Sequence, residues 1–152
     1  MIDARLDLKR RERLGMVEAV WGEHKTAEQI ITILERFSAA DELGLVTRVS
    51  SEKADAVLAA LPAVKAHAHA RCLTLGELPA PPPGPPPVAV LSGGSSDRSV
   101  VAEATLALRC HGIAVDPLMD VGVAGLHRLL DQLPRLESAA CLLYTSDAAD
   151  DV

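Results

Sequence analysis

Apolar residues recur along this chain with the spacing of helices and strands, and the clearest pattern lies past its middle. Val88–Leu91 are four apolar residues in a row, which is typical of a buried parallel strand. A Gly/Ser turn, SGGSSD, follows, and residues 97–111 then have helical spacing. This strand, turn and helix predict a small-molecule site at the carboxyl end of a sheet strand.

The same alternation continues toward the end of the chain. We expect a strand within residues 112–119, a helix over 125–133 and a third strand beginning near Ala139, which together predict a parallel sheet with right-handed crossovers. Two strands and a fragment leave the outer edge of such a sheet unpaired. We therefore expect residues 88–140 to form an incomplete domain and residues 141–152 to be an unrelated tail.

The opening region, residues 1–78, predicts a small α+β unit. Thr26 and Gln29 form a capping box, after which apolar residues recur at helical spacing from Ile30 to Phe37. Ser51 is expected to cap a second helix that stops at Pro62. The other expected elements are a charged helix over Ile2–Leu14, a strand over Leu43–Val49 and a second strand over residues 66–76.

Residues 79–87, PAPPPGPPP, separate the two regions. Such a run cannot donate backbone hydrogen bonds and favours an extended conformation, so it is interpreted as a linker. An SH3-type ligand is the alternative, but the run lacks the Arg or Lys that usually flanks such ligands.

Charge and composition exclude several classes of protein. A net charge of -6 argues against a general nucleic-acid binder, which needs excess Lys and Arg. No apolar run approaches the roughly 20 residues that span a bilayer. The chain opens on charged residues rather than an export signal, and its three cysteines are far apart. A cytoplasmic protein without a disulfide framework is expected.

The SGGSSD turn offers the first candidate chemistry. Ser95, Ser96 and Asp97 bring two hydroxyls and a carboxylate to the start of a helix, where free N–H groups favour anions and can orient a ribose or phosphate. In the alternative interpretation, Ser95 or Ser96 is only the helix N-cap and Asp97 only opposes the helix dipole.

A second candidate, DVGVAGLHR, also follows a predicted strand. Asp120 is expected to share a crevice with Ser96 at neighbouring strand ends, with His127 and Arg128 nearby. In the alternative, its glycines only turn the chain, the histidine lies on the helix surface and the arginine forms an ordinary ion pair.

His67 and His69 are spaced as two residues on one face of a strand. No carboxylate or cysteine lies near them at ligand spacing, so no metal site is predicted.

Several of these motifs together resemble the LarB family of nickel-pincer cofactor biosynthesis proteins, whose second half is similar to PurE, an aminoimidazole ribonucleotide carboxylase/mutase. The resemblance covers roughly residues 5–138. It rests on Arg10, Arg13, Gly15, Glu18, Gly22, Lys25, Thr47, Arg48, Arg71, Ser96, Asp97 and the DVGVAGLHR segment.

The resemblance implies a fold and an activity. The fold would be a small α+β unit followed by the first half of a flavodoxin-like, three-layer α/β sheet. The enzyme would carboxylate the pyridinium ring of nicotinic acid adenine dinucleotide with carbon dioxide and hydrolyse its phosphoanhydride, releasing AMP. Magnesium would assist the cleavage, and the intact family would form a homo-oligomer, an octamer.

The resemblance also assigns roles to residues. Ser95, Ser96, Asp97, Asp120, His127 and Arg128 would line the nucleotide site, and Lys25, Arg48 and Arg71 would meet anionic groups. The family's nucleophilic cysteine, in an Asn-Ser-Cys segment, and its Gly-Met-Glu-Gly turn do not occur in this chain. Its catalytic residues are therefore unknown, and we expect an N-terminal fragment with little or no catalysis.

Two other functions stay open. A purine carboxylase acting on aminoimidazole ribonucleotide shares the fold, but it has no matching N-terminal extension. The second is a non-catalytic nucleotide-binding or interaction module formed by the first 78 residues.

Overall fold

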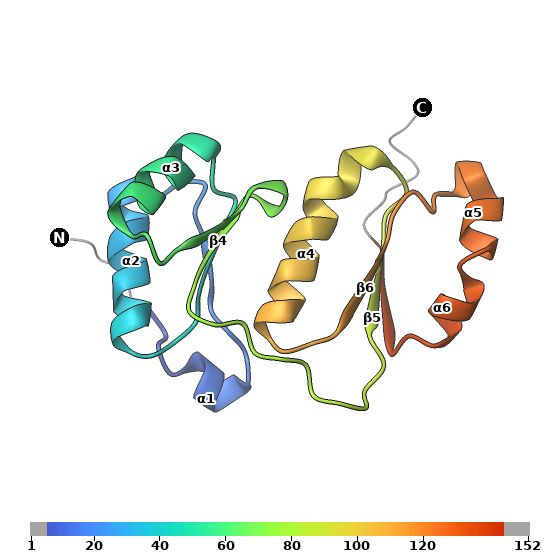
Figure 1. Cartoon of the computed structure of the whole chain (residues 1–152), viewed down its shortest axis with the longest axis horizontal. Coiled ribbons are helices and arrows are strands. Elements are labelled where there is room, and N and C mark those ends of the chain that lie inside the picture. The colour runs from blue at the N-terminus through green and yellow to red at the C-terminus, as the bar shows by residue number, and fades with distance from the viewer. Residues whose placement is uncertain (1–5, 145–152) are drawn as a thin grey trace. The chain divides into compact units, whose positions relative to one another are not determined.

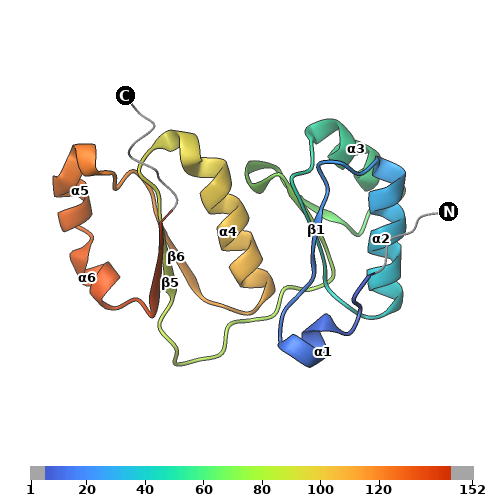
Figure 2. The same ribbon diagram turned by 180° about the vertical axis from the view of Figure 1, so that it is seen from behind.

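The computed structural model describes residues 6–144, and the chain divides into two compact units, Met1–Pro79 and Ala80–Val152. Figures 1 and 2 show the ribbon from opposite sides. We name these parts the N-terminal unit and the C-terminal unit, and each is described by itself.

The N-terminal unit is a four-stranded sheet with two helices, α2 and α3, on one face (Figure 1). The strand order is β1-β2-β4-β3; β1 and β2 are parallel, and the other neighbours are antiparallel. Its elements are α1 (Arg10–Leu14), β1 (Ala19–Trp21), α2 (Ala27–Ala39), β2 (Gly44–Thr47), α3 (Ser51–Ala60), β3 (Lys65–His67), the short 3-10 helix η1 (Ala68–Ala70) and β4 (Cys72–Leu75).

Helix α2 begins at the predicted capping box. The Gln29 N–H donates to Thr26 Oγ1 at 3.2 Å, and the Thr26 N–H donates to Gln29 Oε1 at 2.9 Å. The predicted apolar stripe is confirmed as the buried face of the helix. It joins one hydrophobic core with apolar residues of the sheet: Ile30, Ile33, Leu34 and Phe37 from the helix, and Val20, Val46 and Leu73 from the strands.

Three predictions for this unit need correction. Of the helix expected over Ile2–Leu14, the described part is helical only at Arg10–Leu14, and the Asp7 N–H instead donates to the Glu18 carboxylate at 2.8 Å; residues 2–5 lie outside the described residues. Ser50, not Ser51, caps α3, accepting from the Lys53 N–H at 3.4 Å. Strand β1 was not predicted, since three residues are too few to show an alternating pattern, and the single strand expected over residues 66–76 is instead two antiparallel strands, β3 and β4, separated by the turn η1.

Residues 79–87 contain no helix or strand in the structure, and residues 80–86 are exposed. Among the described residues, no helix is both long enough and apolar enough to cross a membrane.

The C-terminal unit is a three-stranded parallel sheet of order β6-β5-β7. Helix α4 covers one face, and α5 and α6 cover the other (Figures 1 and 2). The predicted mixed α/β class with a parallel sheet is therefore confirmed. The elements are β5 (Val88–Leu91), η2 (Ser95–Asp97), α4 (Arg98–Cys110), β6 (Val115–Leu118), η3 (Val123–Gly125), α5 (Leu126–Leu130), α6 (Leu133–Glu137) and β7 (Cys141–Tyr144).

Strand β5 lies at the centre of this sheet, as its unbroken apolar run predicts. Ala89 and Val90 are fully buried, and Leu91 is nearly so. Ala89 and Leu91 share a core with Leu118 at the end of β6, against which Leu129 packs from α5.

Two predicted boundaries in this unit differ from the structure. The helix expected over residues 125–133 is two short helices, because Pro134 in the first turn of α6 has no N–H to continue the preceding helix. The domain does not stop at residue 140, since Cys141–Tyr144 pair along β5 as strand β7. Main-chain pairing needs only a free strand edge, which β5 offers. Residues 145–152, the rest of the predicted tail, lie outside the described residues.

Candidate functional site

The loops that follow β5 and β6 are joined by main-chain hydrogen bonds. The Ser92 N–H donates to the Leu118 carbonyl, and the Val121 N–H donates to the Ser92 carbonyl, both at 2.9 Å. We name this contact between residues 92–97 and 119–125 the C-terminal junction. It lies where neighbouring parallel strands end, the position at which open α/β sheets bind ligands.

The C-terminal junction depends on Gly122. A Cβ atom at this residue would lie 2.4 Å from the Gly93 carbonyl oxygen, so any side chain would push the two loops apart. The backbone of Gly122 is extended, with a φ of -69°, and it is space rather than conformation that requires glycine.

The hydroxyls of the SGGSSD turn differ in their surroundings. Ser92 is fully buried, and its Oγ donates to the Gly94 carbonyl at 2.6 Å. Ser95 and Ser96 are exposed, and the Ser96 Oγ lies 3.5 Å from Asp97 Oδ1. Asp97 is the N-cap residue of α4 and makes no capping hydrogen bond through its side chain. The interpretation of Ser95 or Ser96 as a side-chain cap is therefore wrong, and both hydroxyls face solvent.

Asp120 and Arg128 form an ion pair across the second loop. Arg128 Nη1 donates to Asp120 Oδ2 at 2.6 Å, and both side chains are partly exposed. The guanidinium lies over Gly125, where a Cβ atom would be 2.4 Å from Arg128 Nε. His127 is exposed on α5. The local geometry is thus the ordinary ion pair of the alternative interpretation.

A cavity of about 290 Å³ opens beside this ion pair, and Asp120 and Arg128 both line it. Ser95 and Ser96 do not line it. The structure thus brings the two loops into contact, but only Asp120 and Arg128, not the serines, line this cavity.

The three predicted anion-binding residues of the N-terminal unit lie beyond strand ends at the same end of its sheet. Lys25 follows β1 and Arg48 follows β2, which is parallel to it. Arg71 precedes the antiparallel strand β4, and its carbonyl accepts from the Val49 N–H at 2.8 Å. Arg48 and Arg71 have positive φ angles of 56° and 52°. We name this set of residues the cationic edge.

The two groups of candidate residues belong to different units. Lys25, Arg48 and Arg71 lie within Met1–Pro79, whereas the serines, Asp97, Asp120, His127 and Arg128 lie within Ala80–Val152.

The loop after β1 is held as firmly as the C-terminal junction. The Gly22 N–H donates to the Thr47 carbonyl at 2.8 Å, and a Cβ atom at Gly22 would lie 2.9 Å from that oxygen. Lys53 Nζ also donates to the Glu23 carbonyl at 2.7 Å. We name this contact between residues 22–25 and 47–49 the N-terminal junction.

Sequence reasoning missed two residues at these junctions. Trp21 ends β1 with its ring 6.0 Å from the Arg48 guanidinium carbon, and Ser92 links the loops of the C-terminal junction. Each directly precedes a glycine at a strand end. That position in the sequence is the signal by which these two residues could have been found.

Histidine and carboxylate side chains do not form a metal site in the described part of the chain. Nε2 of His67 lies 2.9 Å from Thr74 Oγ1, and burial, followed by the charge of Lys65, lowers the pKa of His67. His69 lies on the exposed turn η1. Among residues 6–144, no three His, Cys, Asp or Glu side chains gather to hold a metal ion. The magnesium implied by the resemblance stays a prediction.

The described cysteines differ in reactivity. Cys110 is fully buried in α4, and burial raises the pKa of its thiol to about 11. Cys72 is also buried, whereas Cys141 is exposed on β7. Cys110 is therefore a poor nucleophile at neutral pH.

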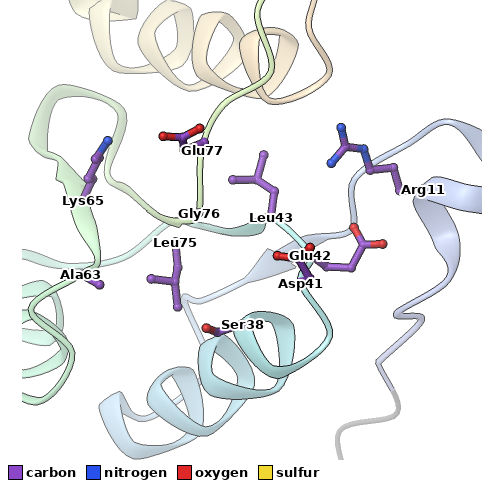
Figure 3. A pocket seen from close by; sticks show the side chains of 10 residues that line it. All are labelled: Arg11, Ser38, Asp41, Glu42, Leu43, Ala63, Lys65, Leu75, Gly76 and Glu77. Carbon is purple, nitrogen blue, oxygen red and sulfur yellow. The ribbon is translucent and has the colours of Figure 1, made fainter.

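The cavity in Figure 3, of about 590 Å³, contains none of the predicted site residues. It lies at the end of the N-terminal sheet opposite the cationic edge, beside the start of β2 and the end of β4. Carboxylates of Asp41, Glu42 and Glu77 line it with the cations of Arg11 and Lys65. This mixture of charges gives no preference for an anionic ligand.

Comparison with known proteins relates the first half of the chain to one family. The model of the LarB/PurE-like N-terminal domain matches residues 1–77. The chain is also 27% identical over 149 residues to "Uncharacterized protein MJ0165" of Methanocaldococcus jannaschii, in a match that covers 93% of this chain. The chain spans 58% of the length of that relative.

Proposed function

The chain belongs to the LarB/PurE-like family, and on this premise we propose that it is the first part of a carboxylase that acts on nicotinic acid adenine dinucleotide. The complete enzyme would add a carboxyl group from carbon dioxide to the pyridinium ring and hydrolyse the phosphoanhydride, releasing AMP. The family match carries the proposal, and the two junctions support it with ligand-binding groups at strand ends.

The carboxylation has a definite chemical requirement. A cationic pyridinium ring cannot attack carbon dioxide until a nucleophile has added to a ring carbon and made the ring electron-rich. The new C–C bond then forms, a base takes the ring proton, and the nucleophile leaves with its electron pair, which restores the pyridinium. Water cleaves the phosphoanhydride in a separate step.

The described residues are suited to binding rather than to this chemistry. Ser95, Ser96 and Asp97 offer exposed hydroxyls and a carboxylate that can hydrogen-bond ribose hydroxyls. Lys25, Arg48 and Arg71 supply positive charge for the phosphates. Cys110 is too buried to attack the ring, and no step is assigned to a metal ion. A homo-oligomer, an octamer in the intact enzyme, belongs to the same proposal.

Calorimetric titration of the full chain tests the binding part of this proposal. We expect nicotinic acid adenine dinucleotide to bind more tightly than aminoimidazole ribonucleotide. Ser96→Ala should weaken that binding about fivefold to tenfold, as the loss of one hydrogen bond predicts. Ser99→Ala removes an exposed hydroxyl within α4 and should leave the affinity unchanged. Tighter binding of aminoimidazole ribonucleotide would favour the purine carboxylase instead.

AMP release tests the catalytic part. We expect the chain by itself to release little or no AMP from the dinucleotide, because it spans only 58% of the length of the relative it matches and lacks the family's Gly-Met-Glu-Gly and Asn-Ser-Cys segments. Turnover matching that of a complete family member would show that this chain carries the full catalytic machinery and would contradict the proposal.

A further inference from the structure

We propose that the exposed indole of Trp21 stacks on the adenine ring of the dinucleotide, and that Lys25 and Arg48 bind the phosphate next to that adenosine. This inference rests on the proposed function, and it assigns one half of the substrate to the N-terminal unit.

Trp21 is the single tryptophan of the chain, and 58% of its surface is exposed. It stands at the end of β1, a strand at the edge of the sheet. Its polar atom is already satisfied, since Nε1 donates to Glu23 Oε2 at 3.1 Å. What remains in solvent is mainly the apolar ring, which offers a base a surface for stacking.

The position of this ring is fixed before any ligand arrives. The N-terminal junction ties Gly22 to Thr47, and Lys53 binds the carbonyls of both Gly22 and Glu23, at 3.3 Å and 2.7 Å. A platform that is already ordered loses little conformational entropy when a ligand binds.

Positive charge borders the ring. The guanidinium carbon of Arg48 lies 6.0 Å from the ring centroid. Lys25 and Trp21 line one cavity of about 270 Å³ together with Glu18. The ammonium and guanidinium groups favour a phosphate, and the Glu18 carboxylate is an acceptor for the amino group of a base.

The size of the cavity favours a mononucleotide half rather than the whole substrate. Pockets for drug-sized ligands are usually about 300–1,000 Å³, and this cavity is slightly smaller than that range. A second half of the dinucleotide would have to extend beyond it.

Hydrogen bonding decides which half binds here. The pyridinium ring of the dinucleotide carries a carboxylate beside its positive nitrogen, so the cations do not select against it, but that ring has no N–H donor. Adenine has an amino group that can donate to the Glu18 carboxylate, which lines the same cavity as Trp21 and Lys25. The adenylate half is therefore the one assigned to Trp21.

Intrinsic fluorescence tests the assignment directly, because Trp21 is the only tryptophan in the chain. Titration of the full chain with AMP should quench the emission saturably, and adenosine should do so with about tenfold weaker affinity. Lys25→Gln should weaken AMP binding about tenfold and leave adenosine binding unchanged. Lys65→Gln, which removes the same charge at the opposite end of the sheet, is the matched control and should bind AMP like the unmodified chain.

Two substitutions of Trp21 separate the contribution of ring stacking from that of charge, with AMP binding measured by calorimetry. Trp21→Ala should weaken AMP binding at least tenfold, and Trp21→Phe, which keeps an aromatic face, should recover most of that loss. Far-UV circular dichroism checks that each variant is folded.

The possible failures are distinguishable. If the dinucleotide binds by calorimetry but Trp21→Ala binds it equally well, the stacking assignment is wrong and the proposed function stands. If Lys65→Gln weakens AMP binding as much as Lys25→Gln, only overall charge matters and the assignment is also wrong. If the dinucleotide does not bind at all, the proposed function itself is overturned.

Discussion

The N-terminal and C-terminal junctions use the same backbone device with opposite surface chemistry. In each, a loop after a parallel strand bonds to the neighbouring strand end, and a glycine allows the close approach: Gly22 against Thr47, and Gly122 against Gly93. The first junction presents an indole and cations. The second presents hydroxyls and carboxylates, with its arginine, Arg128, engaged by Asp120.

This difference shows that a glycine turn at a strand end does not define a ligand by itself. The SGGSSD turn looks like a phosphate site in sequence, yet its own side chains are neutral or acidic, and Arg98 is the cation that directly follows it. The cationic edge of the other unit has three cations, Lys25, Arg48 and Arg71. Backbone geometry provides the position at which a ligand can bind, and the side chains around it decide which ligand charge is favoured.

Enlarging Gly122 should produce the largest effect. Gly122→Ala puts a methyl group 2.4 Å from the Gly93 carbonyl oxygen, so the loops must separate, and we expect a loss of about 3 kcal/mol in the stability of the C-terminal unit. Urea-dependent labelling of the buried Cys110 thiol, read by mass spectrometry, measures that stability.

Gly94→Ala is the control for this variant. A Cβ atom there has only the Ser96 Oγ nearby, at 3.8 Å, so the unfolding midpoint should change little. Equal destabilisation by the two variants would show that close approach is not what Gly122 provides.

Enlarging Gly22 should have a smaller effect of the same kind. The added methyl would lie 2.9 Å from both the Thr47 carbonyl oxygen and a Val46 methyl group. Neither contact is as short as the 2.4 Å at Gly122, and the Val46 side chain can move to relieve one of them. We expect Gly22→Ala to cost about 2 kcal/mol, measured by labelling of Cys72, the buried cysteine of the N-terminal unit. A cost greater than that of Gly122→Ala would reverse the ranking.

The smallest effect concerns pH and the N-terminal unit. Burial lowers the pKa of His67 below its usual value of about 6.5, so the unfolded chain binds more protons as the pH falls below that value. The unit should therefore lose stability between about pH 7 and pH 5. His67→Gln should flatten this dependence, as followed by Cys72 labelling. His69→Gln keeps His67 and should show the pH dependence of the unmodified chain. If His69→Gln flattened that dependence as much as His67→Gln does, His67 would not be its source.

The sequence predicts the elements whose signals are local. The capping box at Thr26 and the apolar run of β5 are both found where expected, because each depends on neighbouring residues. The short strand β1 escapes prediction, since sheet pairing rather than its own three residues stabilises it.

The candidate site is predictable only in part, for a related reason. The contact between the loops after β5 and β6 follows from two parallel strands. The orientation of Asp120 toward Arg128, and the placement of Lys25, Arg48 and Arg71 at one end of the sheet, depend on tertiary contacts that no local pattern records.

The close approach at Gly122 also makes relatives of this chain interpretable without their structures. A side chain at that position cannot coexist with the contact to Gly93. A relative with a larger residue there must have separated loops, and one that keeps glycine can keep them joined. The residue at this one aligned position therefore indicates whether the two loops of a homologue can be joined at the strand ends.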